Sequence, residues 1–261
     1  MNNTNTTAPV LKVAGISKRF GGLQALSDVA LTIERGQVYG LIGPNGAGKT
    51  TFFNVITGLY TPDSGSFELE GHPYEPKAVH LVARSGIART FQNIRLFAEM
   101  TALENVMVGR HVRTSSGVLG AIFRGPKFKA EEAAIRDRAQ ELLAYVGIER
   151  FAQYKARTLS YGDQRRLEIA RALATDPKLI ALDEPAAGMN ATEKVQLREL
   201  IDRIRNDGRT ILLIEHDVKL VMGLCDRVTV LDYGKRLAEG TPAEVQKNEK
   251  VIEAYLGTGG H

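Results

Sequence analysis

The chain has 261 residues, of which 43% are hydrophobic and 25% are charged, and its formal net charge is +4. This composition is ordinary for a globular domain, and the dispersed basic residues argue against a nucleic-acid-binding surface. The single cysteine, Cys225, excludes an internal disulfide and is expected to be an apolar core residue.

Residues 1–10 are expected to form a disordered tail. They are rich in Asn and Thr and lack the basic start and apolar stretch of a signal peptide. Nowhere does the sequence contain the run of about 18 apolar residues that crosses a bilayer. A protein of this kind that serves a membrane is expected to do so as a peripheral subunit.

Short strands are predicted at Leu11–Ile16 and Ala30–Ile33, with a turn at Gly21-Gly22 between them. Continuous apolar runs, typical of strands buried on both faces of a parallel sheet, occur at Val38–Ile42, Leu179–Leu182, Ile211–Ile214 and Val228–Leu231. Because helix-like stretches separate these runs, the predicted fold class is α/β.

A glycine-rich loop follows the strand predicted at Val38–Ile42. It fits the phosphate-binding pattern G-x-x-x-x-G-K-[ST] and comprises Gly43, Pro44, Asn45, Gly46, Ala47, Gly48, Lys49, Thr50 and the following Thr51. Its glycines let backbone N–H groups surround phosphate oxygens, while Lys49 offers a charge to the β- and γ-phosphates and Thr50 a hydroxyl to Mg²⁺. The helix expected from Gly48 to Gly58 points its positive dipole end at the same anion. The predicted ligands are ATP and Mg²⁺.

Residues 95–157 interrupt the alternation of strands and helices. Glu131–Val146 has apolar residues at helical spacing, and Gly147 stands where a helix C-cap is expected. We predict a helical subdomain at 95–157, inserted into an α/β core formed by 11–94 and 158–240, with a C-terminal helical segment and tail at 241–261. The apolar cluster in Ser115–Gly125 lies beside basic residues, which suits either an interface with a membrane subunit or packing inside the subdomain.

A second candidate phosphate site precedes the helix predicted to begin at Arg165. Its residues are Ser160, Tyr161, Gly162, Asp163 and Gln164. Ser160 and Asp163 have the spacing of a capping box, which is a purely structural role. Capping does not require Gly162, however, and a glycine in the first turn gives other groups close access to the N–H groups of a helix N-terminus.

Two adjacent carboxylates, Asp183 and Glu184, follow the apolar run Leu179–Leu182. Such a pair at the tip of a buried strand is costly unless a cation or a reaction needs it. Asp183 is placed to serve Mg²⁺, and Glu184 to orient and deprotonate an attacking water. The alternative is a solvated strand end before Pro185.

Three other residues are ambiguous when considered alone. His216 follows the run Ile211–Ile214, where a histidine is more often structural than catalytic. Gln92 is an ordinary polar residue, and Phe20 is by default a packing residue.

These features occur in the order found in ABC transporter ATPases, which the chain resembles over nearly its whole length. The stretches that carry the resemblance are Gly43–Thr51, Gln92, Leu159–Arg166, Leu179–Pro185 and His216. The resemblance implies a P-loop NTPase core of the ABC ATPase type, with a small antiparallel β subdomain and an inserted helical subdomain. It also implies an ATPase that works as one half of a dimer enclosing ATP.

The resemblance assigns a role to each matching residue. Phe20 corresponds to the aromatic that stacks on adenine, and Gln92 to the Q-loop glutamine, which reaches Mg²⁺ and the water and senses the membrane partner. Residues 160–164 correspond to the signature segment, which holds the γ-phosphate of ATP bound to the other subunit. The implied metal ligands are Thr50, Gln92 and Asp183, and the implied catalytic residues are Glu184 and His216, the latter as the switch histidine.

Three residues depart from the general family pattern. Tyr161 replaces the first signature glycine, Asp163 replaces the usual glutamine, and Asn190 replaces the common aspartate of the D-loop at residues 187–190. The communication between sites that the family assigns to that aspartate is therefore not carried over to Asn190.

More narrowly, the chain resembles the ATP-binding subunits of branched-chain amino-acid importers through Arg89–Phe97, Ala186–Gly188 and Val251–Gly257. This resemblance implies a second ATPase subunit, identical or homologous, two transmembrane permease subunits and, indirectly, an extracytoplasmic binding protein. It implies a peripheral location at the cytoplasmic face of the inner membrane and no nucleic-acid partner.

Two alternatives remain open at this stage. One is an ABC ATPase of a lipid or polysaccharide exporter, which the motifs alone also suit. The other is a soluble ABC ATPase acting on nucleic acid or ribosomes, but such proteins usually have two cassettes or long coiled-coil insertions. A non-hydrolysing regulator is disfavoured by Glu184.

Overall fold

The computed structural model describes residues 8–111 and 126–256. The predicted interface at Ser115–Gly125 and most of the predicted tail lie outside these residues. The predicted disordered tail at residues 1–10 extends too far. Val10 is buried, and its amide donates to the carbonyl oxygen of Ile33 at 2.9 Å. Within the described residues, no helix combines the length and apolar character needed to span a membrane.

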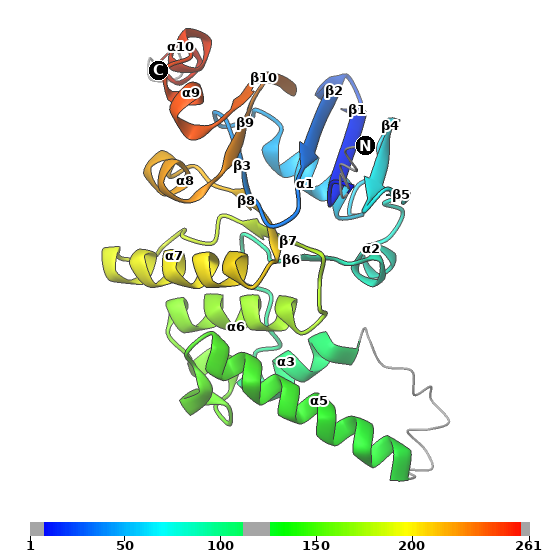
Figure 1. The fold of residues 1–261 in the computed structure, drawn as a ribbon, viewed down its shortest axis with the longest axis vertical. Coiled ribbons are helices and arrows are strands. Elements are labelled where there is room, and N and C mark those ends of the chain that lie inside the picture. Colours follow the sequence, from blue (N-terminus) through cyan, green and yellow to red (C-terminus); the bar gives the residue numbers. More distant parts are fainter. Residues whose placement is uncertain (1–7, 112–125, 257–261) are drawn as a thin grey trace, which may run out of the picture.

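An antiparallel sheet has the strand order β2-β1-β4-β5 (Figure 1). Its strands are β1 (Leu11–Phe20), β2 (Leu23–Ile33), β4 (Ser64–Leu69) and β5 (His72–Pro73). The first two are longer than predicted because they pair as a hairpin up to the glycine turn, where Phe20 lies opposite Leu23. Their outer ends are exposed, so the apolar pattern alone does not mark them.

A second sheet has the order β10-β9-β3-β8-β7-β6, parallel except for β10. Its strands are β3 (Val38–Ile42), β6 (Ile87–Arg89), β7 (Leu179–Asp183), β8 (Thr210–Ile214), β9 (Arg227–Asp232) and β10 (Lys235–Gly240). Every residue of β3, β7 and β8 is buried, which confirms the interpretation of their apolar runs as central strands. Because these three strands are parallel, their carboxyl ends meet at one edge, where open α/β sheets bind ligands.

Helix α1 (Lys49–Ile56) lies between the two sheets (Figure 1). Its buried side chains join the antiparallel sheet and one face of the parallel sheet in a single apolar cluster. The predicted helix that starts at the glycine-rich loop is present, but it ends at Ile56 rather than Gly58, and it buries Phe52, Val55 and Ile56. Since α1 is clamped on both sides, its N-terminus is fixed relative to the strand edge.

The other face of the parallel sheet packs against a second apolar cluster contributed by helices. These and the remaining helices are α2 (Val79–Ser85), α3 (Ala102–Arg110), α5 (Pro126–Tyr145), α6 (Tyr161–Leu173), α7 (Ala191–Asn206), α8 (Val218–Leu224), α9 (Pro242–Gln246) and α10 (Glu249–Leu256), with 3-10 turns at Glu149–Phe151 and Ala156–Thr158. Helices α3, α5 and α6 stack beneath the core in Figure 1, and α9 and α10 lie at the opposite end. Helix α5 begins earlier than the predicted Glu131 and ends before Gly147, whose φ is +77°.

Candidate nucleotide site

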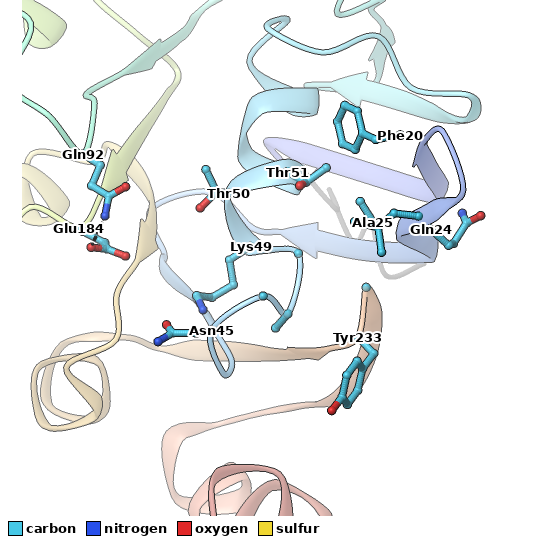
Figure 2. A pocket seen from close by; sticks show the side chains of 15 residues that line it. Phe20, Gln24, Ala25, Asn45, Lys49, Thr50, Thr51, Gln92, Glu184 and Tyr233 are labelled. Atoms are coloured by element: carbon cyan, nitrogen blue, oxygen red, sulfur yellow. Dashed lines mark hydrogen bonds between the residues drawn. The ribbon is translucent and has the colours of Figure 1, made fainter. Parts of the chain in front are cut away.

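A pocket of about 490 Å³ opens beyond the carboxyl end of β3 (Figure 2). It is lined by Phe20, Leu23, Gln24, Ala25, Asn45, Gly46, Ala47, Gly48, Lys49, Thr50, Thr51, Gln92, Glu184, Tyr233 and Gly234. Gln92 and Glu184 lie side by side at one end, Phe20 and Tyr233 lie toward the other, and Lys49 lies between (Figure 2). The pocket therefore has a polar, acidic end and an aromatic end, separated by the glycine-rich loop.

Two glycines of the loop occupy positions that no other residue fits. Gly43 has φ +151°, and a Cβ there would lie 2.1 Å from the carbonyl oxygen of Leu231. Gly48 has φ +99°, and its Cβ would lie 2.7 Å from the carbonyl oxygen of Ala25. The loop is thus seated between β9 and β2, where the glycines permit close backbone contact.

The loop delivers a cation and an open helix N-terminus to the same place. Helix α1 has no side-chain cap at Gly48, so its first N–H groups face the pocket without a side-chain partner from that residue. Lys49 is only 8% exposed, and its Nζ donates to the carbonyl oxygens of Gly43 at 2.6 Å and Pro44 at 2.8 Å. Burial lowers the pKa of Lys49, and the nearby Glu184 opposes that shift. This combination is suited to an anion.

Four residues that the sequence singled out lie at or beside the acidic end of the pocket, and two of them, Gln92 and Glu184, line it. Glu184 Oε2 accepts a hydrogen bond from Gln92 Nε2 at 2.9 Å, and His216 Nδ1 lies 3.6 Å from the same oxygen. Asp183 ends β7 and is 4% exposed. Burial raises the pKa of Asp183 to about 6, while Arg89 acts in the opposite direction. A carboxylate held this way is stabilised by any cation that approaches it.

The segment 160–164 does not reach this pocket. Ser160 is the N-cap of α6, and its Oγ accepts from the amide of Asp163 at 3.2 Å and donates to Asp163 Oδ2 at 2.7 Å. The predicted capping box is therefore only half present. The Asp163 carboxylate accepts a hydrogen bond from the hydroxyl of Ser160 and not from the backbone N–H of Ser160, which a complete capping box requires. Gln164 Nε2 donates to the carbonyl oxygen of Leu159 at 3.0 Å.

Within this chain, the side chain closest to Gly162 is the carboxylate of Glu193. A Cβ at Gly162 would lie 2.7 Å from Glu193 Oε1, so a larger residue there would displace the end of the Glu193 side chain on α7. Glu193 and Asn190 form a complete capping box at the start of α7. Tyr161 covers Gly188, with its ring 3.2 Å from where a Cβ would stand. The three departures from the family pattern thus have local structural partners.

Phe20 lies in the pocket and also packs. Its ring meets Tyr60 edge-on at 5.2 Å between centroids, yet 42% of the residue is exposed. The two roles considered from the sequence are therefore compatible, because one edge of the ring is held while part of it faces solvent.

Sequence reasoning missed the pocket residues Leu23, Gln24, Ala25, Tyr233 and Gly234. The turn between β9 and β10 reaches the pocket because Gly234 N donates to Ala47 O at 3.0 Å and Ser27 N donates to Gly234 O at 2.8 Å. A usable signal existed in the Tyr233-Gly234 turn, which follows a strand predicted to be buried in the same sheet.

Glu215 is a second residue that the sequence reasoning missed. It is 1% exposed, and its Oε1 accepts from the amide of Ala186 at 2.9 Å. Burial raises the pKa of Glu215, and hydrogen bonds from backbone N–H groups act in the opposite direction. The carboxylate ties the turn after Glu184 to the strand end that carries His216. A charged residue at the end of a fully apolar run was the available signal.

Comparisons with known proteins show which family the chain is similar to. The sequence matches the family described as ABC transporter over residues 26–187, and the family described as branched-chain amino acid ATP-binding cassette transporter over residues 235–261. Two relatives are the high-affinity branched-chain amino acid transport ATP-binding proteins BraF of Pseudomonas aeruginosa and LivG of Escherichia coli. Each is 47% identical over 250 residues, which cover 95% of this chain and 98% of the relative. The lipopolysaccharide export system ATP-binding protein LptB of Escherichia coli is 33% identical and covers 95% of this chain and 97% of its own.

Solved structures with the same fold include nucleotide-bound cassettes. An ATP-binding cassette of an ABC transporter in its ADP conformation has a TM-score of 0.83 at 33% identity, covering 96% of this chain and all of its own. A dimeric cassette in a post-hydrolysis state, bound to ADP and Pi, has a TM-score of 0.75 at 27% identity, covering 89% of this chain and 98% of its own. The predicted fold class is confirmed.

Proposed function

The chain belongs to the ABC transporter family of ATP-binding proteins, and from this premise we propose that it powers an importer of branched-chain or other hydrophobic amino acids. The main support for branched-chain amino acids as the substrate class is the 47% identity with BraF and LivG, which extends over nearly the full length of both chains. Both relatives are named as branched-chain amino acid transport proteins. The match over residues 235–261 supports this substrate class independently. The exporter alternative has the weaker support of a 33% identical relative.

The pocket has the polarity that a bound ATP needs. The phosphates lie on the glycine-rich loop, where Lys49 and the N-terminus of α1 supply positive charge. The base extends toward the aromatic end, where Phe20 stacks on it. The γ-phosphate then lies at the acidic end beside Gln92 and Glu184. A single orientation of the nucleotide satisfies both ends.

The proposed metal ligands fit Mg²⁺ that is shared with a nucleotide. Among the described residues, no group of three or more His, Cys, Asp or Glu side chains could form a metal site without other ligands. Thr50, Gln92 and Asp183 offer hydroxyl, amide and carboxylate oxygens, which suit Mg²⁺ that also binds phosphates. The buried carboxylate of Asp183 is the strongest indication, because its anionic form gains from a nearby cation. When bound, Mg²⁺ neutralises charge that develops on the phosphates.

Glu184 is the proposed general base. Its carboxylate orients the attacking water and accepts a proton from it, while the amide of Gln92 donates to the same carboxylate and fixes its direction. His216 Nδ1 lies 3.6 Å from the same oxygen of Glu184. We assign His216 the contact with the γ-phosphate. The hydrogen bond from Gln92 holds the carboxylate in place before the reaction.

The signature segment acts in the partner subunit's site. Ser160 through Gln164 begin a helix whose N-terminus lies away from the chain's own pocket, so a second ATPase chain, identical or homologous, is needed to bring phosphate to it. The dimeric structure of a related cassette supports this arrangement. Each ATP is then enclosed by the P-loop of one chain and the signature of the other.

Two permease subunits and, indirectly, an extracytoplasmic binding protein complete the proposed transporter, which places this chain at the cytoplasmic face of the membrane. A cleft of about 300 Å³ lies beside the loop that carries Gln92, and it is lined by apolar side chains together with Arg89 and Arg171. Phe91 lines this cleft, whereas the next residue, Gln92, lines the nucleotide pocket. We propose that a segment of the permease binds in this cleft. Contact with Phe91 would then shift the adjacent residue, Gln92, in the nucleotide pocket.

The test is a reconstituted transport assay. The chain is purified from native membranes with its permease subunits, placed in vesicles with the binding protein, and supplied with ATP and labelled leucine. Leucine-stimulated ATP hydrolysis and leucine uptake are expected, and both should be lost when Glu184→Gln replaces the wild-type chain. Stimulation by a lipid or polysaccharide, with no response to any branched-chain amino acid, would contradict the proposed substrate class.

A further inference from the structure

The loop that carries Gln92 is attached to helix α6 by a buried ion pair. Arg165 Nη1 donates to the carbonyl oxygen of Phe91 at 2.6 Å, and Arg165 Nη2 donates to the carbonyl oxygen of Gln92. On the other side of the loop, Glu168 Oε1 accepts from the amide of Arg95 at 2.9 Å. The main chain is therefore held before and after the turn, by two residues from one face of one helix.

The two side chains are also bonded to each other. Arg165 Nη1 lies 3.1 Å from Glu168 Oε2, and the two side chains are 2% and 1% exposed. Burial raises the pKa of Glu168, and Arg165 and Arg171 act against that shift. A buried ion pair seldom stabilises a fold more than apolar residues of the same volume would. The pair is therefore better explained by the position that it gives to the loop than by a contribution to fold stability.

Arg165 also reaches toward the signature segment. Its Nη2 donates to the hydroxyl of Tyr161 at 2.9 Å, one turn nearer the N-terminus of α6. The same helix is capped by Ser160, the residue proposed to hold the partner's ATP. One guanidinium thus contacts both the start of the signature helix and the main chain of Gln92.

We propose that Arg165 and Glu168 are positioning residues for ATP hydrolysis, acting as a clasp that holds the main chain of Gln92 so that its amide meets Glu184. The inference rests on the proposed roles of Gln92 and Glu184. The clasp also makes α6 a rigid link, so that a shift of α6 when Ser160 engages the partner's ATP moves Gln92 in this chain's own site. Arg165 and Glu168 do not line the nucleotide pocket and act through Gln92.

The decisive variant removes both charges together. Arg165→Met with Glu168→Leu keeps an apolar core of similar volume and removes both members of the pair, although Arg171, which lies 4.0 Å from Glu168, then loses its ionic partner. In the transporter assembled with its partners, we expect unchanged MgATP affinity, because the P-loop is intact. We expect kcat to fall by about 10- to 100-fold, since displacing a catalytic group by about 1 Å can cost that much. Adding Gln92→Ala to the double variant should then lower kcat little further.

A matched control and a gentler variant separate positioning from folding. Arg203→Met removes another arginine that donates to a main-chain carbonyl, that of Tyr145 at 2.9 Å, far from the loop. Its kcat should equal that of the wild type. Arg165→Lys keeps the charge beside Glu168 but loses the fork that grips two carbonyls, so it should fold normally and lower kcat with KM unchanged.

A tryptophan reporter supplies a readout independent of turnover. The chain contains no tryptophan, so Phe91→Trp places a single tryptophan on the loop, which is excited selectively at wavelengths that tyrosine does not absorb. Arg165→Lys in this background should increase its quenching by acrylamide, whereas Arg203→Met should not. If the double variant and Arg165→Lys both keep the wild-type kcat while Gln92→Ala is impaired, the clasp proposal is overturned. The proposed role of Gln92 would then still stand. Wild-type kcat in Gln92→Ala would overturn the proposed role of Gln92 and, with it, the clasp.

Discussion

The P-loop end and the signature end of the chain differ in how complete they are. At the P-loop end, Lys49, Gln92 and Glu184 come from separate elements and converge on one pocket, with their polar groups bonded to one another or to the loop. At the signature end, the hydroxyl of Ser160 is engaged by the neighbouring Asp163, and the segment lies outside the pocket. Under the proposed function, the chain therefore contains a whole site for binding nucleotide and half of a site for enclosing it.

Because of this difference, nucleotide binding and ATP turnover should depend on different parts of the chain. Nucleotide binding is expected from one chain, because the loop, the helix N-terminus and the aromatic wall are all present. Turnover is expected only when a partner's signature closes over the γ-phosphate. Substitutions at the two ends should therefore affect different measurements, and the following variants are ordered by the size of the expected effect.

Glu184→Gln should give the largest effect. The amide keeps the size of the side chain and can still bond to Gln92, but it cannot accept the proton of the attacking water. Loss of a general base typically costs about 10²- to 10⁴-fold in rate. MgATP binding should persist, and the closed ATP-bound dimer should accumulate in size-exclusion chromatography with ATP. Full turnover of this variant with its native partners would remove Glu184 from the mechanism.

Lys49→Ala should weaken MgATP binding by about 10- to 100-fold, because hydrogen bonds from a charged group contribute about 1.5–3 kcal/mol. Titration with a fluorescent nucleotide measures the effect. Since Lys49 also bonds two loop carbonyls, calorimetry should confirm that the variant still unfolds cooperatively. An unchanged affinity would contradict the P-loop assignment.

Phe20→Ala should weaken ATP and GTP binding together by about five-fold. Stacking of a base on an aromatic contributes about 1–3 kcal/mol, and the lower value is expected because the ring is already engaged by Tyr60. Base preference should change little, since every base has a π-face. If neither nucleotide binds more weakly, Phe20 serves packing alone, and Tyr233 becomes the aromatic to substitute next.

Asn190→Ala should have the smallest effect, a loss of about 1 kcal/mol in the free energy of unfolding, because it removes the side-chain cap of α7. Asn190→Asp is the matched control and should preserve stability, since aspartate caps equally well. Denaturant unfolding curves compare the two. Equal stability of Asn190→Ala and the wild type would show that the capping box observed here contributes nothing.

The fold could be predicted from the sequence where local patterns decide the structure. The strand Val38–Ile42 has the predicted bounds, because a buried apolar run determines its conformation. The helix after Gly48 begins where the phosphate-loop pattern predicts but ends at Ile56, before the predicted Gly58. The outer halves of β1 and β2 were missed, because their pairing depends on the hairpin rather than on apolar spacing.

The candidate site was predictable only where its residues lie in contiguous motifs. Tyr233 and Gly234 reach the pocket through contacts between β9–β10 and the loop, which are far apart in sequence. Glu215, Arg165 and Glu168 are buried charges whose partners are main-chain groups of other elements. Main-chain partners leave no mark on the sequence, so Arg165 and Glu168 were recognised only from the structure. Glu215 did have a signal, its charge at the end of an apolar run, but the sequence reasoning did not use it.

The most direct test of the account compares nucleotide affinity and turnover in Lys49→Ala and Ser160→Arg. In the isolated chain, Lys49→Ala should lose MgATP affinity, whereas Ser160→Arg should bind MgATP as the wild type does, because Ser160 belongs to the partner's site. In the assembled transporter, both variants should lose ATP turnover. Weakened binding by the isolated Ser160→Arg chain, or full turnover of that variant when assembled, would contradict the division of the site between two chains.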